Sequence, residues 1–318
     1  MDPASDKPAV AASAPIADKT DNAASTADFK GEVQTTNDLP FREDLKKTED
    51  YIVLDRDGRT HTFKSLYTGP NVPRRVLVVF VRHFFCGNCQ EYLRTLAESI
   101  TTDSLLSLPV STFITVVGCG DPRLIDMYAR ETGCPFPIYT DPKGQLFAAL
   151  GMTKTLSPGE KPAYMRKGML GGAISSIGQG LKQISAGLAL KAGDHRQVGG
   201  EFLFEPLNIA TPITTPQDEK KNIGAGGLDQ GIIGDTRSSG AEDDAETGYS
   251  EEKKVSWCHR MRSTRDHTEM PELMEVLGLE GQGKPADNPE LWKKALSTRK
   301  GTGISLAADM SELTNAQK

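Results

Sequence analysis

Two cysteines separated by two residues, Cys86 and Cys89, are the side chains of this sequence best suited to chemistry. The sulfurs of a Cys-x-x-Cys pair come within bonding reach when the first residue begins a helix and the second lies one turn further on. At a helix start, unpaired backbone N–H groups and the helix dipole favour the thiolate, which is the attacking species in thiol–disulfide exchange. The spacing therefore predicts redox chemistry if the neighbouring elements place the pair at a helix start.

The residues on either side of the pair predict that placement. Residues 75–82 read Arg-Val-Leu-Val-Val-Phe-Val-Arg, an apolar run typical of a central parallel strand that is buried on both faces. Residues 91–100 carry apolar side chains at helical spacing. A buried strand thus leads directly into the pair, and a helix leads out of it.

Two other interpretations of the pair stay open. The cysteines could be buried structural thiols, or they could form half of a zinc site. A zinc site of this kind needs four ligands, and Cys258-His259 matches the second half of a ribbon or finger spacing poorly. We therefore favour the redox interpretation.

Other polar residues are candidates for supporting roles. Arg82 lies just ahead of the pair and could lower a thiol pKa by its charge, although a surface or loop-closing role explains it equally well. Cys119 follows a second predicted strand and is a candidate third thiol, against the alternative of a small residue in a Gly-rich turn. A structural role is expected for Cys134 and Cys258. A structural hydrogen-bond cluster is also expected for His259, Arg260, Asp266 and His267, against the alternative that they orient a substrate near the active edge.

The order of the remaining elements predicts an α/β fold with a mixed, centrally parallel sheet flanked by helices. Such sheets place their reactive groups at the carboxyl ends of strands, where the pair and Cys119 both lie. The expected strands are a hairpin at residues 51–63, buried strands at 111–117 and 136–139, and a second hairpin formed by 198–204 and 254–260. The expected helices lie at residues 91–100, 122–132, 143–150 and 270–279.

Composition divides the chain into one domain with unstructured additions. We expect a disordered N-terminal tail at residues 1–40, a domain at 41–280 and a mostly disordered C-terminal tail at 281–318. A Gly- and acid-rich insert at 210–252 is expected to interrupt the domain without folding. Residues 160–192 form a Gly-interrupted amphipathic segment. Its many glycines and modest basic charge favour a helix packed on the domain over the alternative of a helix on a membrane surface.

Charge and apolar content exclude several classes of partner. The net charge of -6 and the pI near 5.5 give no electrostatic reason to expect nucleic acid. No apolar run is long enough to span a membrane, and no secretory signal is recognisable. The cysteines are odd in number and mostly far apart, which favours reduced thiols in the cytoplasm.

The sequence around the pair resembles a known family. Residues 79–92 read Val-Phe-Val-Arg-His-Phe-Phe-Cys-Gly-Asn-Cys-Gln-Glu-Tyr, which is similar to the motif of the peroxiredoxin-like 2 family, whose fungal members are called AhpC/TSA antioxidant-enzyme-domain proteins. Further matches follow in order at residues 116–120, 138–142, 149–152 and 197–200, at His259-Arg260 and at Asp266-His267. The resemblance covers about residues 45–280 apart from the insert.

The resemblance implies a thioredoxin-like fold and an antioxidant or reductase activity on small oxidised substrates; at least one relative reduces prostaglandin endoperoxides. The peroxiredoxin register makes Cys89 the attacking thiol, whereas the thioredoxin register makes Cys86 the attacker and Cys89 the resolver. The sequence departs from both patterns. The peroxiredoxin Pro-x-x-x-Thr is absent, and Gly199-Gly200 stands where thioredoxins carry a cis-proline.

We therefore expect a thiol-dependent antioxidant oxidoreductase that reduces a peroxide, an endoperoxide or a disulfide through Cys86 and Cys89. Cys86, which lies nearer the helix start, is the expected attacker. The oxidised pair would be reduced by an external thiol such as thioredoxin or glutathione, and no metal, flavin or nicotinamide cofactor is expected. The alternative is a catalytically weak redox-regulatory or scaffold protein on the same fold.

Overall fold

The computed structural model describes residues 35–165, 187–188, 190–207, 251–281, 283 and 289–305. The described strands form one mixed sheet in the order β2-β1-β5-β4-β3-β6-β7-β8. These strands are β1 Ile52–Leu54, β2 Thr60–Thr62, β3 Arg75–Phe80, β4 Thr112–Gly118, β5 Ile138–Thr140, β6 Gly200–Pro206, β7 Lys253–Arg260 and β8 Thr302–Gly303. The described α-helices are α1 Arg42–Thr48, α2 Gly87–Ser99, α3 Thr102–Leu106, α4 Ile125–Thr132, α5 Gln145–Ala149, α8 Met270–Leu277 and α9 Pro289–Ser297.

The centre of the sheet confirms the predicted fold class. β3 pairs with β4 in parallel, and β4 pairs with β5 in parallel. On its other side β3 pairs antiparallel with β6, which forms the predicted hairpin with β7. A parallel strand-helix-strand unit followed by an antiparallel hairpin, with the cysteine pair after the first strand, is a thioredoxin-like arrangement.

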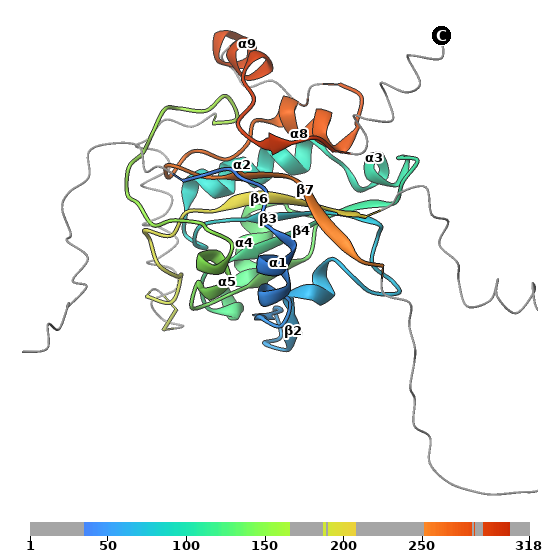
Figure 1. Cartoon of the computed structure of the whole chain (residues 1–318). Helices are drawn as coiled ribbons and strands as arrows, with labels where there is room; N and C mark the ends of the chain where they lie inside the picture. The colour runs from blue at the N-terminus through green and yellow to red at the C-terminus, as the bar shows by residue number, and fades with distance from the viewer. Residues whose placement is uncertain are drawn as a thin grey trace, which may run out of the picture. The chain divides into compact units, whose positions relative to one another are not determined.

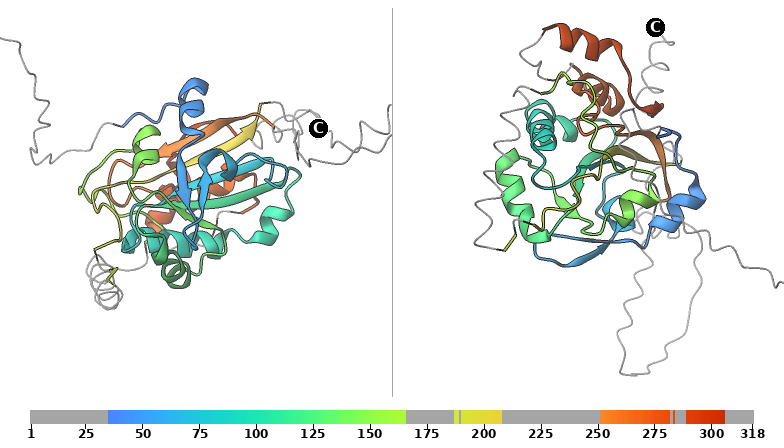
Figure 2. Two further views of the ribbon diagram at one scale, coloured as in Figure 1. Left: turned by 90° about the horizontal axis from the view of Figure 1, so that it is seen from below. Right: turned by 90° about the vertical axis from the view of Figure 1, so that its left-hand side faces the viewer.

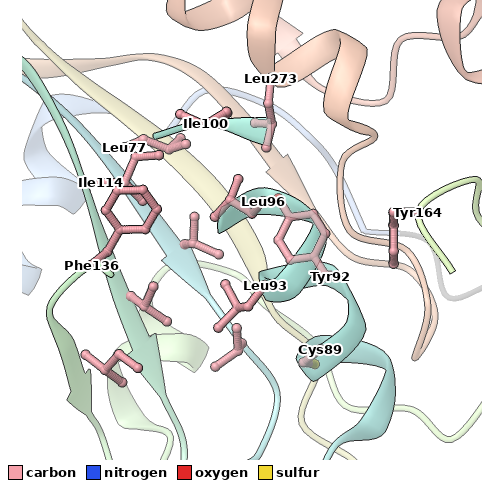
Figure 3. Close-up of a cluster of buried hydrophobic side chains, with 14 of the residues drawn as sticks. Leu77, Cys89, Tyr92, Leu93, Leu96, Ile100, Ile114, Phe136, Tyr164 and Leu273 are labelled. Atoms are coloured by element: carbon pink, nitrogen blue, oxygen red, sulfur yellow. The ribbon is translucent and has the colours of Figure 1, made fainter. Parts of the chain in front are cut away.

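Alternation along β3 divides the core into two layers. Leu77 and Val79 pack with α2, α4 and α8 on one face of the sheet. Val78 and Phe80 pack with α1 and α5 on the other face. All six residues of β3 are buried, because helices cover both faces of a central strand (Figure 1). The cysteine pair belongs to the α2 face, whose side chains are drawn in Figure 3.

A buried arginine ties the central strands to α8. Arg75, at the start of β3, forms an ion pair with Glu205 of β6, with 2.7 Å between Nε and Oε1. Its guanidinium also donates to the carbonyls of Val276 and Leu277, both at 3.0 Å. These carbonyls lie in the last turn of α8, where a helix lacks internal donors and where a cation is favourable. Arg75 is 2% exposed, so its charge depends on these contacts.

The C-terminal part of the chain differs from the sequence prediction. The expected tail at residues 281–318 includes α9, which lies on the outer side of α8 and buries Trp292 (Figure 2). It also includes β8, which pairs with β7. The apolar stripe that α9 buries spans only nine residues, too short a window for periodicity to stand out beside its glycine-rich surroundings.

Part of the expected N-terminal tail is also ordered. The Asn37 side chain accepts from Arg260 N–H at 2.8 Å and donates to the Lys300 carbonyl at 2.7 Å. Residues 1–34 of that tail, most of the insert at 210–252 and the centre of the amphipathic segment at 160–192 lie outside the described residues. No described helix is long and apolar enough to cross a membrane.

Replacing Arg75 by methionine tests whether this ion pair supports the fold. The change removes the buried ion pair with Glu205 and the two hydrogen bonds that Arg75 donates to the α8 carbonyls. We expect the free energy of unfolding to fall by about 3–5 kcal/mol, measured by urea titration. The matched Lys47→Met variant breaks an exposed ion pair with Asp44 and should cause a far smaller loss. Equal losses in the two variants would contradict the assignment.

Candidate active site

The cysteine pair lies where the sequence predicts, at the start of α2 after β3. Cys86 is the N-cap of α2, and Cys89 occupies its first turn (Figure 3). A tight turn before the helix is closed by the Cys86 N–H, which donates to the His83 carbonyl at 2.9 Å. Cys86 is 3% exposed and Cys89 is fully buried. Strand, turn and helix therefore fix the positions of both sulfur atoms.

The Cys86 sulfur accepts hydrogen bonds from three directions. The Cys89 N–H donates to Cys86 Sγ at 3.4 Å, as expected for an N-cap side chain. The Cys89 thiol donates to the same sulfur at 3.0 Å. The third donor is Arg82 Nη1, at 3.3 Å. An acceptor surrounded by donors is stabilised as an anion, so this geometry favours thiolate at Cys86 and thiol at Cys89.

Arg82 brings a positive charge into the interior beside the pair. Its side chain is 5% exposed, and within the described part of the chain no carboxylate lies within ion-pair distance of it. Two backbone carbonyls hold it instead: Nε donates to Gln197 at 3.0 Å, and Nη2 donates to His195 at 2.5 Å. The Cys86 sulfur is thus the group that can supply a counter-charge. Burial of an unpaired charge is costly, and the thiolate relieves that cost.

The pKa values of the two thiols shift in opposite directions. Burial raises the pKa of the Cys86 thiol, but the hydrogen bond from Cys89 and the charge of Arg82 outweigh it. The net result is a pKa well below the usual value. Burial, together with the hydrogen bond to Cys86 and the negative charge there, raises the pKa of Cys89 well above the usual value. Because the two groups share one proton, they titrate as a pair.

The residue after Arg82 is a buried histidine, His83. His83 is 7% exposed, and its ring contacts the His195 ring edge-on with centroids 4.4 Å apart. Burial lowers the pKa of His83 to about 4, so the ring is neutral at physiological pH. The sequence interpretation did not identify His195, and it included Gln197 only in the family match at residues 197–200. Each of the two residues holds Arg82 through its backbone carbonyl and lies more than 100 residues after Arg82 in the chain. A pattern of side chains does not reveal such a contact.

Gly199 explains the departure from the thioredoxin cis-proline. An added Cβ at Gly199 would lie 1.8 Å from the Phe80 carbonyl oxygen, so only glycine permits this approach of the two backbones. The neighbouring Gly200 pairs with Phe80 in the sheet, and Gln197 lies two residues before Gly199. The close approach brings the carbonyls that hold Arg82 up to the end of β3.

The structure does not bring Cys119 to the pair. Cys119 packs with Val117 in the core on the α5 face, whereas Cys86 and Cys89 belong to the α2 face. Burial raises the pKa of Cys119. Burial also raises the pKa values of Cys134 and Cys258, each to about 11. Among all the cysteines of the chain, Cys86 alone has a lowered pKa.

The histidine cluster is a buried hydrogen-bond network centred on Glu201, a residue that sequence interpretation missed. The Glu201 carboxylate accepts from His259 Nδ1 at 2.9 Å, from His267 Nδ1 at 2.6 Å and from Thr268 Oγ1 at 3.0 Å. The His267 ring also stacks on Tyr92 of α2, with centroids 4.1 Å apart. The network therefore supports the helix that carries the pair. Among the described residues no group of three or more candidate ligands is arranged to hold a metal ion.

Comparison with known proteins gives similarities of sequence. A profile of the AhpC/TSA antioxidant enzyme family matches residues 95–211, a stretch that begins after the cysteine pair. Peroxiredoxin-like 2C of Mus musculus is 33% identical over 159 residues, which cover 49% of this chain and 66% of the mouse protein. Peroxiredoxin-like 2C of Takifugu rubripes is 28% identical over 165 residues, which cover 51% of this chain and 70% of the Takifugu protein. The chain thus spans about two thirds of the relatives that it matches.

Solved structures of low sequence identity are also similar in part. A Xanthomonas campestris bacterioferritin comigratory protein is 15% identical with a TM-score of 0.30, covering 54% of this chain and 80% of that protein. Peroxidoxin BcpB from Mycobacterium tuberculosis is 14% identical with a TM-score of 0.30. The similarity covers 39% of this chain and 70% of that protein. At these scores the fold assignment rests on strand order and pairing.

Replacing Arg82 by methionine should raise the pKa of the Cys86 thiol, because the change removes a charge and a donor from its sulfur. The measurement is a pH titration of thiolate absorbance near 240 nm. Arg94→Met removes a cation from α2, which follows the pair, without touching the sulfur and should leave the titration unchanged. An unchanged thiol pKa in folded Arg82→Met protein would refute the role of Arg82.

Replacing Glu201 by glutamine should destabilise the protein in a pH-dependent way. The pKa of Glu201 falls from 4.5 to about 2, so its contribution is present above pH 4.5 and lost as pH falls through about 2. The pKa of His259 rises from 6.5 to about 9, so its contribution is present below pH 6.5 and lost as pH rises through about 9.

The difference in unfolding free energy between the original chain and the Glu201→Gln variant should therefore be largest between pH 4.5 and 6.5, at about 3 kcal/mol. Urea titrations at pH 3, 5.5 and 9.5 measure it. Glu43→Gln removes an exposed carboxylate from α1 as the control and should give a small difference at every pH. A Glu201 difference that does not vary with pH would contradict the ion-pair assignment.

Proposed function

We propose, from the premise that this chain belongs to the peroxiredoxin-like family of AhpC/TSA proteins, that it is a thiol-dependent antioxidant oxidoreductase. Cys86 is the attacking thiol and Cys89 is the resolving thiol. The observation that carries the proposal is the set of three donors converging on Cys86 Sγ, one of which is a buried cation. Arg82 has no carboxylate partner among the described residues, so its buried positive charge favours the thiolate form of Cys86.

The first step is attack by the Cys86 thiolate on one oxygen of a peroxide. The O–O bond breaks, Cys86 becomes a sulfenic acid, and the departing alkoxide takes up a proton to leave as an alcohol. An endoperoxide would react in the same way, except that the opened ring stays attached to sulfur through oxygen. The Arg82 guanidinium, held by the His195 and Gln197 carbonyls, is positioned to stabilise the negative charge before and during attack.

The second step joins the two sulfurs. The Cys89 sulfur attacks Cys86, its proton leaves with the departing oxygen as water or alcohol, and a Cys86–Cys89 disulfide forms. The sulfurs already lie 3.0 Å apart, so little movement is needed. Two thiol equivalents from an external donor, thioredoxin or glutathione, then restore both thiols and are themselves oxidised to a disulfide.

Burial of the pair indicates which substrates can reach it, and the free state of the cysteines indicates the cellular compartment. With Cys86 only 3% exposed, a peroxide or endoperoxide group reaches the sulfur more readily than the disulfide of a folded protein does. We therefore propose a small oxidised substrate. All the cysteines are free in the structure, and a resting dithiol fits the reducing environment of the cytoplasm.

A second candidate function is supported by the same burial. A catalytically weak redox-regulatory protein would hold a protected pair and respond slowly to oxidant. The two functions differ in turnover: an enzyme consumes many equivalents of peroxide per chain with a thiol donor, whereas a regulator stops after one.

Serine substitutions test the proposed roles. Cys86→Ser should lower peroxide turnover at least about 1,000-fold and abolish even the first stoichiometric reaction. Cys89→Ser should also stop multiple turnover but should leave a sulfenic acid or mixed disulfide on Cys86, detected by mass spectrometry. Cys134→Ser and Cys258→Ser are the matched controls and should keep turnover. An adduct trapped on Cys89 in Cys86→Ser would reverse the roles, and full turnover in both pair mutants would refute the mechanism.

A further inference from the structure

The partners of the Arg82 guanidinium differ between the two redox states of the cysteine pair. In the dithiol form, the Cys86 sulfur accepts from Nη1 at 3.3 Å and supplies a negative charge. In a Cys86–Cys89 disulfide that sulfur is neutral. The other described acceptors are the carbonyls of His195 and Gln197, which accept hydrogen bonds but carry no net charge. Oxidation therefore leaves a buried cation without a counter-charge, which is unfavourable.

Arg82 also connects the pair to the chain segment just before β6. The two ends of this segment are held by backbone hydrogen bonds that do not involve Arg82. The Ala192 carbonyl accepts from the Phe84 N–H at 3.1 Å, and the Arg196 carbonyl accepts from the Thr155 N–H at 2.7 Å. These hydrogen bonds do not depend on the charge of the pair, so they anchor both ends in either redox state.

The middle of the segment depends on Arg82. The His195 carbonyl accepts from Arg82 Nη2 at 2.5 Å, although His195 itself is exposed. Asp194 forms an ion pair with Lys154 at 2.9 Å, but the two side chains are 38% and 45% exposed, so this pair contributes little. Release of Arg82 would therefore free His195 while the ends of the segment stay in place.

Arg82 and His195 also limit access to the pair. The guanidinium lies against the sulfur of Cys86, which is only 3% exposed, and the His195 ring contacts the buried His83 ring. An external thiol reduces a disulfide by direct attack on one of its sulfur atoms. Movement of Arg82 toward solvent would remove the group that lies against Cys86 and would open a path for that attack.

We propose that Arg82 and residues 193–195 form a redox-sensitive cover over Cys86. The thiolate holds the cover closed, and conversion to the disulfide releases the guanidinium toward solvent and exposes the oxidised pair to its thiol reductant. The cover rests on the proposed function, because the Cys86–Cys89 disulfide is the oxidised state of that mechanism. In its formation the two sulfurs become bonded, and the Cys89 proton and two electrons pass to the oxidant.

Modification of arginine by phenylglyoxal tests the cover in the full chain. Diamide, which takes up two electrons and two protons, converts the dithiol form to the disulfide form. Peptide mass spectrometry should show Arg82 modified at least about tenfold faster in the disulfide form, because the released guanidinium reaches solvent. Arg75 is the internal control: it is 2% exposed, keeps its Glu205 partner in both forms and should stay protected. Equal rates of Arg82 modification in the two forms would overturn the proposal.

Two substitutions of Cys86 separate the loss of charge from the formation of a disulfide. Cys86→Asp keeps a negative charge beside Arg82, whereas Cys86→Asn removes it with nearly the same side-chain shape. Both new side chains are good helix N-caps, so α2 begins equally well in either variant. Arg82 should be modified at least about tenfold faster in Cys86→Asn than in Cys86→Asp. Equal rates in these two variants would show that charge does not control the cover.

The comparison of the two variants needs no oxidant, so its result is independent of turnover. Absence of peroxide turnover in the original chain, with Arg82 still protected in Cys86→Asp and modified in Cys86→Asn, would contradict the proposed function and leave the charge-controlled cover supported. Normal turnover with equal Arg82 modification in the two variants would contradict the cover alone.

Discussion

The arrangement around the cysteine pair depends on a permanent positive charge in the interior. The Arg82 side chain is 5% exposed, and among the described residues no carboxylate is within ion-pair distance of its guanidinium. The Arg82 guanidinium donates hydrogen bonds to two backbone carbonyls and to the Cys86 sulfur. Carbonyl dipoles satisfy the N–H groups of a guanidinium but do not neutralise it. Cys86 is therefore held in a site where its ionised form is favourable, although burial alone would oppose ionisation.

The rest of the fold can be understood as what holds those groups in place. β3 delivers Arg82 and the pair, and α2 supplies the N-cap geometry at Cys86. Gly199 allows the backbone before β6 to approach Phe80, which brings the Gln197 carbonyl to Arg82. The Glu201 network then supports α2 from the opposite side through the ring of Tyr92. A second buried arginine holds β3, β6 and α8 together at the far end of the strand.

Sequence patterns predicted the elements better than the contacts between them. The central strand, the helix after the pair and the hairpin of β6 and β7 were predictable because burial and periodicity are local properties of the chain. The supports of Arg82 were not, since they are backbone carbonyls brought near by the fold. Cys119 follows β4 at the carboxyl edge of the sheet, but its side chain packs on the other face from the pair. Residues two apart in an extended segment share a face, and Val117 lies on the face away from the pair.

The α9 segment shows a different limit. Its helix buries only two of its nine residues, Trp292 and Ala295, so its stability comes from packing on α8 and not from a strong pattern of its own. The strand β8 contributes only two residues to the sheet. Short elements of this kind depend on tertiary contacts that a local sequence window does not contain.

The stabilised thiolate also has a consequence for electron transfer. Arg82 and the two donors from Cys89 lower the free energy of the reduced pair, but they lose most of that effect once Cys86 is bonded to Cys89 and carries no charge. Selective stabilisation of the dithiol makes the disulfide a stronger oxidant and raises its reduction potential. In the proposed mechanism, the contacts that stabilise the Cys86 thiolate therefore also favour the return of the oxidised pair to its reduced form.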